Sequence, residues 1–189
     1  MAGADPPRVA FQGARGAFSE EAAHLLVGRF RPQPRRTLAS VFAAVAAGAA
    51  DAAVVPVHNR IAGPVPAAAA LLRRHACVIA GRLWLPIAQH LVLLPGARLS
   101  ALRRVASHPV ALAQCARYLR LHPRLRAQPA WDTAGSVAAL AVAGDLARAA
   151  IAGAHAARLY RMALGPRVDD RADNATCFVL LRPGAPRLE

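Results

Sequence analysis

The sequence predicts an α/β protein, and three observations lead to this fold class. Short apolar segments typical of strands alternate with segments whose apolar residues recur at helical spacing. A glycine-rich turn joins the first such pair, directly after Phe11. The composition is 56% hydrophobic and only 5% aromatic, which indicates a closely packed globular protein. At 189 residues, the chain suffices for one compact domain or two small lobes.

In the first half of the chain, a strand at residues 8–11 runs into GARGAFSEEAAHLL, where two glycines permit a tight turn and Ser19 can cap a helix. A helix at 40–47 precedes the apolar strand AAVVPV (52–57), and a further helix ends at Arg74. Because strand and helix alternate, the sheet is expected to be largely parallel.

The second half repeats the alternation. In SHPVALAQC, Ser107 is expected to cap a helix with Pro109 in its first turn. The other predicted elements are one or two strands within 83–94, a strand at 105–106, helices starting at 132–136 and covering AAIAGAHAARLY (149–160), and a last strand at 177–183.

The charge is strongly positive: the formal net charge is +14, and all 24 basic residues are arginine. The lack of lysine excludes a lysine Schiff base. The arginines are scattered in ones and twos without interleaved aromatic residues, so nucleic acid is not expected as a partner. The positive charge instead suits a small anionic substrate.

The cysteines and the apolar segments indicate in which cell compartment the protein is expected. Cys77, Cys115 and Cys177 form no CxxC pair and no metal-binding spacing with histidine, so we expect a reduced cytoplasmic protein without a metal site. The first residues, MAGADPPRVAFQG, lack the charged start and long apolar stretch of an export signal. The Ala-rich run at 41–57 is interrupted by glycine, aspartate and proline, so no membrane partner is expected.

Three turns place small or hydroxyl residues at a predicted helix N-terminus: GARGAFS (13–19), SHP (107–109) and DTAGS (132–136). Unpaired backbone N–H groups and the helix dipole attract anions at such positions, so together the turns could bind carboxylates. GARGAFS lacks the full GxGxxG spacing and no GK[ST] motif occurs, so nucleotide binding is not expected there.

Taken in order, the motifs make the chain similar to the prephenate dehydratase family from about Val9 to Leu181. They are VAFQGARGAFSEEAA, VFAAVAAGAADAAVVPVHNRIAGPV, PIAQHLVLL, SHPVALAQC, DTAGS, AAIAGAHAARLY and DNATCF. The resemblance implies two small α/β lobes of the type II periplasmic-binding-protein kind with substrate in the cleft between them. Residues 1–81 and 163–187 would form the first lobe, and 82–162 the second.

The resemblance also implies a reaction, in which a carbon–oxygen lyase expels CO2 and water from the dianion prephenate and leaves phenylpyruvate for phenylalanine biosynthesis. The family's catalytic polar residues correspond to Asn59, Ser107, Gln114 and Thr176 in this chain. Thr176 would be the proton donor to the departing hydroxyl, and the other three would orient the ring and its carboxylate. The backbone N–H groups of residues 133–135 (Thr133, Ala134 and Gly135) would bind a carboxylate.

Two motifs depart from the family pattern. The chain has His58-Asn59-Arg60 where the family has Glu-Asn-Ser, and Thr176-Cys177-Phe178 where it has Thr-Arg-Phe. We expect Arg60 to replace the substrate-facing cation lost at Cys177 and His58 to offer a second proton donor, with Phe178 in the substrate-binding set. Alternatively, Arg60 and His58 are exposed loop residues and Cys177 is a small buried apolar residue.

These departures leave two other functions open. One is a decarboxylase that removes CO2 from prephenate without loss of the hydroxyl, giving dihydro-hydroxyphenylpyruvate for specialised metabolism. The other is a ligand-binding homologue without turnover. The family implies no cofactor and a homodimer. The family's phenylalanine-sensing ACT module does not follow Leu181, so feedback inhibition through it is not expected.

Overall fold

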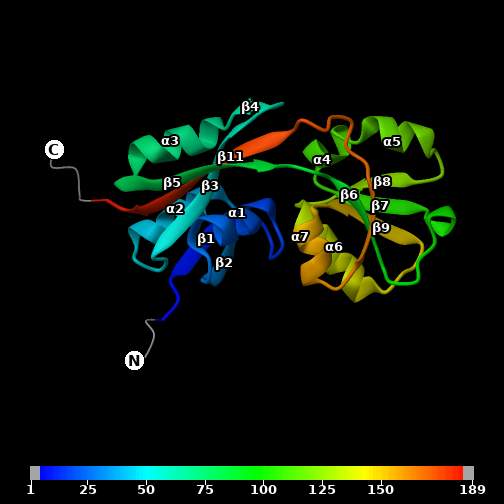
Figure 1. Cartoon of the computed structure of the whole chain (residues 1–189), viewed down its shortest axis with the longest axis horizontal. Coiled ribbons are helices and arrows are strands. Elements are labelled where there is room, and N and C mark those ends of the chain that lie inside the picture. Colours follow the sequence, from blue (N-terminus) through cyan, green and yellow to red (C-terminus); the bar gives the residue numbers. More distant parts are fainter. Residues whose placement is uncertain (1–4, 185–189) are drawn as a thin grey trace. The chain divides into compact units, whose positions relative to one another are not determined.

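The computed structural model describes residues 5–184 and consists of two compact α/β units, each with its own sheet (Figure 1). The first unit contains residues 5–13, Phe18–Pro86 and 175–184, and the second contains Ala14–Ala17 and Ile87–Asn174. The chain therefore passes between the units at Pro86 and Asn174 rather than near residues 82 and 163. The expected crossing points lie inside continuous strands, which explains the difference.

The sheet of the first unit has the strand order β2-β1-β3-β11-β5, with the short β4 also paired to β3. Strands β1, β2 and β3 are parallel, whereas β11 runs antiparallel to both of its neighbours. Its elements are β1 (Arg8–Gln12), α1 (Phe18–Val27), β2 (Arg31–Arg35), α2 (Leu38–Ala46), β3 (Ala52–Asn59), β4 (Gly63–Pro64), α3 (Pro66–Arg74), β5 (Cys77–Pro86) and β11 (Ala175–Pro183).

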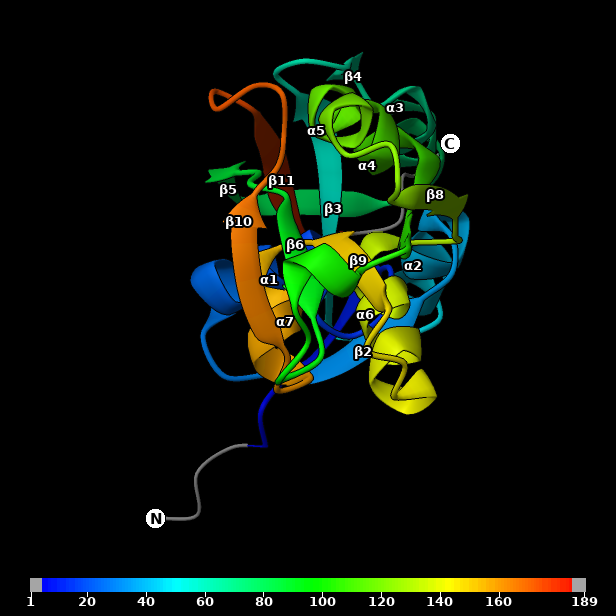
Figure 2. The ribbon, with the colours of Figure 1, turned by 90° about the vertical axis from the view of Figure 1, so that its right-hand side faces the viewer.

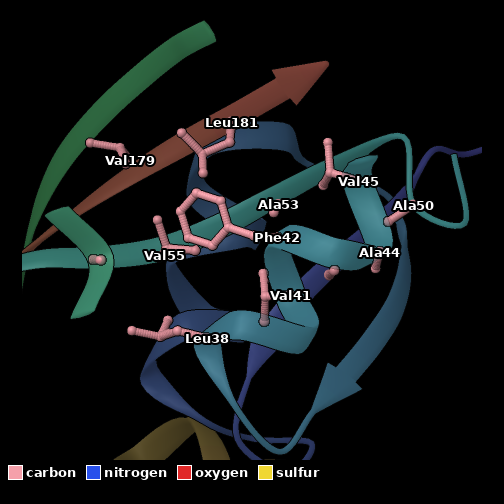
Figure 3. Packing of buried hydrophobic residues seen from close by; sticks show 12 residues of the cluster. Leu38, Val41, Phe42, Ala44, Val45, Ala50, Ala53, Val55, Val179 and Leu181 are labelled. Atoms are coloured by element: carbon pink, nitrogen blue, oxygen red, sulfur yellow. The ribbon is translucent and has the colours of Figure 1, made fainter. Parts of the chain in front are cut away.

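The core of the first unit lies where α2 and α3 cover one face of this sheet. Helix α2 is fixed at its start by a capping box, in which Thr37 and Ser40 satisfy each other's backbone N–H groups. Its Phe42 is fully buried and projects toward Val55 of β3 and Leu181 of β11 (Figure 3). The first and last thirds of the chain thus share one apolar core.

The second unit has the strand order β10-β6-β9-β7-β8, in which β8, β7 and β9 are parallel and β6 and β10 antiparallel. Helices α4 and α5 lie on one side of this sheet and α6 and α7 on the other (Figure 2). Its elements are β6 (His90–Leu93), η1 (Leu99–Ala101), β7 (Arg104–Ser107), α4 (Pro109–Ala113), α5 (Ala116–Leu121), β8 (Arg126–Pro129), α6 (Thr133–Ala143), β9 (Arg148–Ala152), α7 (Ala154–Leu159) and β10 (Ala163–Arg167).

Successive residues of the strands point to opposite faces of this second sheet, so each strand contributes apolar side chains to both faces. Leu91 and Ile151 pack beneath α4 and α5, whereas Val92 and Ala150 pack against α6 and α7. Because both faces are covered, its central strands are apolar almost throughout.

The α/β class is confirmed, but several sequence predictions were wrong in detail. Both sheets are mixed rather than largely parallel. Residues 149–152 belong to strand β9, so the helix predicted at 149–160 begins only at Ala154. Helix α1 begins at Phe18, so Ser19 lies within its first turn. The cap of α4 is His108, whose Nδ1 accepts from the Val110 N–H at 3.2 Å, and not Ser107.

Besides the two-residue β4, the strands that the sequence did not predict are β2, β8 and β10. All three lie at a sheet edge, and each contains proline. An edge strand needs neither a complete ladder of N–H donors nor two apolar faces, so it tolerates proline and arginine. In residues 5–184, no helix combines the length and apolar character that crossing a bilayer requires.

We predict that Phe42→Ala lowers the free energy of unfolding by about 3–5 kcal/mol, because it removes a large ring from a closed core. Val142→Ala is the control: its side chain is 90% exposed, so the change should stay within about 0.5 kcal/mol. Urea unfolding of both variants measures the difference. A loss below about 1 kcal/mol for Phe42→Ala would mean that this core is not closed.

Candidate active site

The predicted site residues fall into two groups, one in each unit. Residues 58–60 and 176–178 lie in the first unit, at the adjoining ends of β3 and β11. Ser107, Gln114 and residues 133–135 lie in the second unit. The polar side chains among them carry mainly hydroxyl and amide groups, which suit hydrogen bonding to a carboxylate or hydroxyl better than metal coordination.

Asn59 and Thr176 form the central pair of the first group. They are register partners on β3 and β11, and the Asn59 Nδ2 donates to the Thr176 Oγ1 at 2.8 Å. Thr176 is only 8% exposed, so this bond is shielded from bulk water. The backbone adds a second link, because the Arg60 N–H donates to the Ala175 carbonyl at 2.8 Å.

The turn after β3 fixes the orientation of the Asn59 amide. Its Oδ1 accepts from the backbone N–H groups of Ile61 at 3.0 Å and Ala62 at 2.8 Å. Because only the oxygen can accept these bonds, the NH2 end must face β11. There it meets the Thr176 hydroxyl and, at 3.3 Å, the Ala175 carbonyl.

This arrangement determines what the Thr176 hydroxyl can do. Its oxygen is occupied as an acceptor, which leaves its own proton for another acceptor. Within residues 5–184, the side chain makes no hydrogen bond besides that with Asn59. The pair can therefore donate one hydrogen bond from the Thr176 hydroxyl to a ligand.

The neighbouring residues form the next rung of the sheet and point to the opposite face. Cys177 pairs with His58 on one side and with Trp84 on the other. The His58 and Trp84 rings meet edge to face across this narrow cysteine, with centroids 5.8 Å apart. The Arg60 guanidinium also lies 5.8 Å from the Trp84 ring centroid, a cation–π distance.

These contacts bear on the two interpretations of the sequence departures. Cys177 is buried, at 3% exposure, whereas His58 and Arg60 are exposed. The Arg60 guanidinium lies next to the Trp84 ring, and Trp84 is the register partner of Cys177, so Arg60 places a cation close to position 177. Phe178 is 3% exposed and has little surface left for a ligand. The sequence analysis did not identify Trp84 as a site residue. In β5 this tryptophan is exposed, whereas its neighbours Leu83 and Leu85 are more buried.

In the second unit, Ser107 ends β7 and is fully buried. Its Oγ donates to the Ile151 carbonyl at 2.6 Å, which ties the end of β7 to β9. Gln114 caps the end of α4 and is half-buried, and its side-chain amide makes no hydrogen bond to another residue of the described chain. Ser107 thus supports the strand ends, whereas Gln114 retains donors and an acceptor for a ligand.

The start of α6 is organised by Asp132, which the sequence identified only as part of a turn. Its carboxylate caps the helix by accepting from the Gly135 N–H, and it also accepts from the Ala14 N–H at 2.6 Å. The Gly135 N–H is therefore occupied, and Thr133 and Ala134 are the remaining predicted donors of this turn. A side chain at Gly135 would collide with the Asp132 carboxylate, so the carboxylate that caps the helix would have to shift.

Cys115 follows Gln114 and is fully buried. Burial, and secondarily the charges of Asp169 and Asp170, raise the pKa of its thiol to about 12. Since the thiolate is the reactive form, Cys115 is not suited to be a nucleophile at neutral pH.

Comparison with known proteins identifies the family of the chain. The sequence pattern of the family described as "PDT: Prephenate dehydratase" matches residues 9–185. "Arogenate dehydratase 3, chloroplastic" of Arabidopsis thaliana is 39% identical over 186 residues, which are 96% of this chain and 44% of the relative. The chain thus spans less than half the length of this curated relative.

Solved structures show the same fold. The prephenate dehydratase of Arthrobacter aurescens in complex with L-Phe has a TM-score of 0.84 and 29% identity, covering 96% of this chain and 62% of that one. A structure described as "GqqA- a novel type of quorum quenching acylases" has a TM-score of 0.84 and 32% identity, covering 96% of this chain and 66% of that one. The expected α/β fold of the type II periplasmic-binding-protein kind is confirmed. With the family pattern covering nearly its whole length, the chain belongs to the prephenate dehydratase family.

Proposed function

We propose that the chain is the catalytic part of a dehydratase that converts prephenate to phenylpyruvate, CO2 and water. The observation that carries this proposal is the Asn59–Thr176 pair, which leaves the Thr176 proton as a donor at a shielded position. Membership of the prephenate dehydratase family supports the reaction type, as do the dehydratase names of the Arabidopsis thaliana relative and of the Arthrobacter aurescens structure.

The reaction needs such a donor because its leaving group is hydroxide. The bond between the ring and its carboxylate breaks, and the electron pair enters the ring as CO2 departs. The ring then expels the hydroxyl with its bonding pair and becomes aromatic. A hydrogen bond from Thr176 stabilises the negative charge that develops on the departing oxygen. The proton that completes the water molecule comes ultimately from solvent, so the charge balances.

The charges of the described chain favour prephenate over arogenate as the substrate. Arogenate carries an ammonium group where prephenate has a ketone, so it calls for an acceptor of positive charge. The aspartates of the described residues are already engaged by arginine (Asp5, Asp51, Asp145, Asp169 and Asp173) or by backbone N–H groups (Asp132 and Asp170). Both substrates carry two carboxylates, and the ketone of prephenate adds no positive charge, so the dianion prephenate matches the surplus of arginine better.

We predict that the purified chain forms phenylpyruvate from prephenate, with a kcat/KM at least about tenfold above that for arogenate, as one lost charge interaction implies. Ultraviolet absorption detects phenylpyruvate, and chromatography detects phenylalanine from arogenate. A higher kcat/KM for arogenate would overturn the substrate assignment. A non-aromatic dienyl product would indicate the decarboxylase, and binding without product the inactive homologue.

For Thr176→Val, we predict a fall in kcat of about 10²- to 10⁴-fold, the usual contribution of a positioned proton donor. The substitution keeps the shape of the side chain and removes the hydroxyl. Thr176→Ser keeps the hydroxyl and should retain kcat within about tenfold. Steady-state kinetics on both variants, with far-ultraviolet circular dichroism to confirm folding, makes the comparison. Equal activity of Thr176→Val and the unaltered chain would exclude Thr176 as the donor.

For Arg60→Ala, we predict a KM for prephenate about tenfold or more higher, with a smaller change in kcat, because a charge-assisted hydrogen bond to a carboxylate is lost. Arg60→Lys keeps the charge and should recover part of the affinity. If Arg60→Ala leaves the KM unchanged, Arg60 is only a surface residue packed on Trp84.

A further inference from the structure

Three arginines form one rung across the parallel strands of the second unit. Arg104 of β7 is the register partner of Arg126 on β8 and of Arg148 on β9. Neighbouring strands lie about 4.8 Å apart, and register partners on parallel strands project from the same face. Like charges directly opposite each other destabilise a sheet, so this rung opposes the stability of the fold.

One aspartate offsets part of this charge. Asp145 forms ion pairs with Arg148 at 3.2 Å and with Arg104 at 3.6 Å. Within the described part of the chain, neither Arg126 nor its neighbour Arg124 forms an ion pair. The positive charge is therefore greatest at the β8 end of the rung.

The same end of the sheet is hollowed. Arg103, Arg104, Arg124 and Arg126 line an open hollow of about 580 Å³ together with Pro123. The Arg103 guanidinium is held in place, because it donates to the carbonyls of Ser100 at 3.0 Å and Leu102 at 2.9 Å. Four arginines thus line a space large enough for a small molecule.

An apolar pocket of about 440 Å³ adjoins this hollow and shares Pro123 and Arg124 with it. Its wall includes Leu102, Leu125 and Tyr118, whose ring stacks on His122 with centroids 4.1 Å apart. An anion bound in the hollow could therefore carry an organic group into the pocket.

We propose that the arginine hollow binds the polyphosphate group of a small anion. Guanidinium forks match phosphate oxygens in paired hydrogen bonds, and several of them together favour a multiply charged anion over a monocarboxylate. Five arginines and one aspartate leave a surplus of four positive charges around the rung, close to the charge of a triphosphate.

This site is separate from the candidate active site. Arg104 begins β7 and Ser107 ends it, so the arginines lie at the opposite end of the strand from the catalytic group of this unit. Parallel strands in register place Arg126 and Arg148 at the same end as Arg104. The hollow can thus be occupied independently of a substrate near Ser107.

The test is calorimetric titration of the whole chain with inorganic triphosphate and with ATP at low ionic strength, where screening is weak. We expect triphosphate to bind, and the double variant Arg124→Ala/Arg126→Ala to weaken binding at least about tenfold, since two charge-assisted contacts are lost. The matched control is Arg73→Ala/Arg74→Ala, which removes the same charge from exposed positions of α3 in the other unit. It should change the affinity less than about twofold.

If ATP binds more tightly than triphosphate, the ligand also uses the apolar pocket. If ATP binds more weakly than triphosphate, the polyphosphate group alone is recognised. Both results support the site. It is overturned if the unaltered chain does not bind triphosphate, or if the two double variants lose affinity equally. Arg124→Lys/Arg126→Lys, which preserves charge but not the paired geometry, should bind between the unaltered chain and the alanine variant. Activity on prephenate without triphosphate should be the same in the unaltered chain and in Arg124→Ala/Arg126→Ala, so failure here is distinguishable from failure of the proposed function.

Discussion

The hydrogen bond from Asn59 to Thr176 is the contact on which the first half of the site depends. It joins the last residue of β3 to the second residue of β11, two segments separated by more than one hundred positions in the chain. It also sets the direction of the Thr176 proton, because the turn at Ile61 and Ala62 leaves the Asn59 amide only one orientation. A donor of fixed direction needs no reorganisation when charge develops next to it, which is the physical basis of electrostatic catalysis.

The position of β11 explains why this contact is rigid. The strand lies between β3 and β5 and pairs with both along most of its length. Val179 and Leu181 of β11 are fully buried in the core beneath α2. The sheet of the first unit therefore cannot be complete until the chain has returned from the second unit. Such non-local pairing slows folding but holds Thr176 within a sheet rather than on a free loop.

The sequence predicted those parts of the fold in which a local pattern agrees with the tertiary environment. Buried strands such as β1, β3 and β11 carry continuous apolar runs, and their positions were correct within a few residues. The three missed edge strands carry proline and arginine because tertiary pairing, not local preference, makes them strands. The lobe boundaries likewise depend on which residues contact one another.

The candidate site was predicted through family motifs, and sequence could not supply its geometry. Motifs identified Asn59 and Thr176, but the spacing of residues in the sequence does not predict the hydrogen bond between them. Nor does it predict the strand register that pairs Cys177 with His58. The role expected for Ser107 is the one most altered, because its hydroxyl donates to the Ile151 carbonyl. The homodimer and the cytoplasmic location stay predictions.

The small side chain of Cys177 gives the departures from the family pattern a common cause. In a sheet, side chains two strands apart meet only if the residue between them is small. The His58 and Trp84 rings do meet across Cys177, and Arg60 packs on the same tryptophan. An arginine at position 177 would project between these rings and separate them. The residues at positions 58, 60 and 177 are thus physically coupled. An arginine introduced at position 177 alone would put a second cation beside Arg60, whereas a serine introduced at position 60 alone would leave a gap beside Trp84. His58, Arg60 and Trp84 thus form one packed cluster beside Cys177, and Arg60 supplies its cation from the turn after β3.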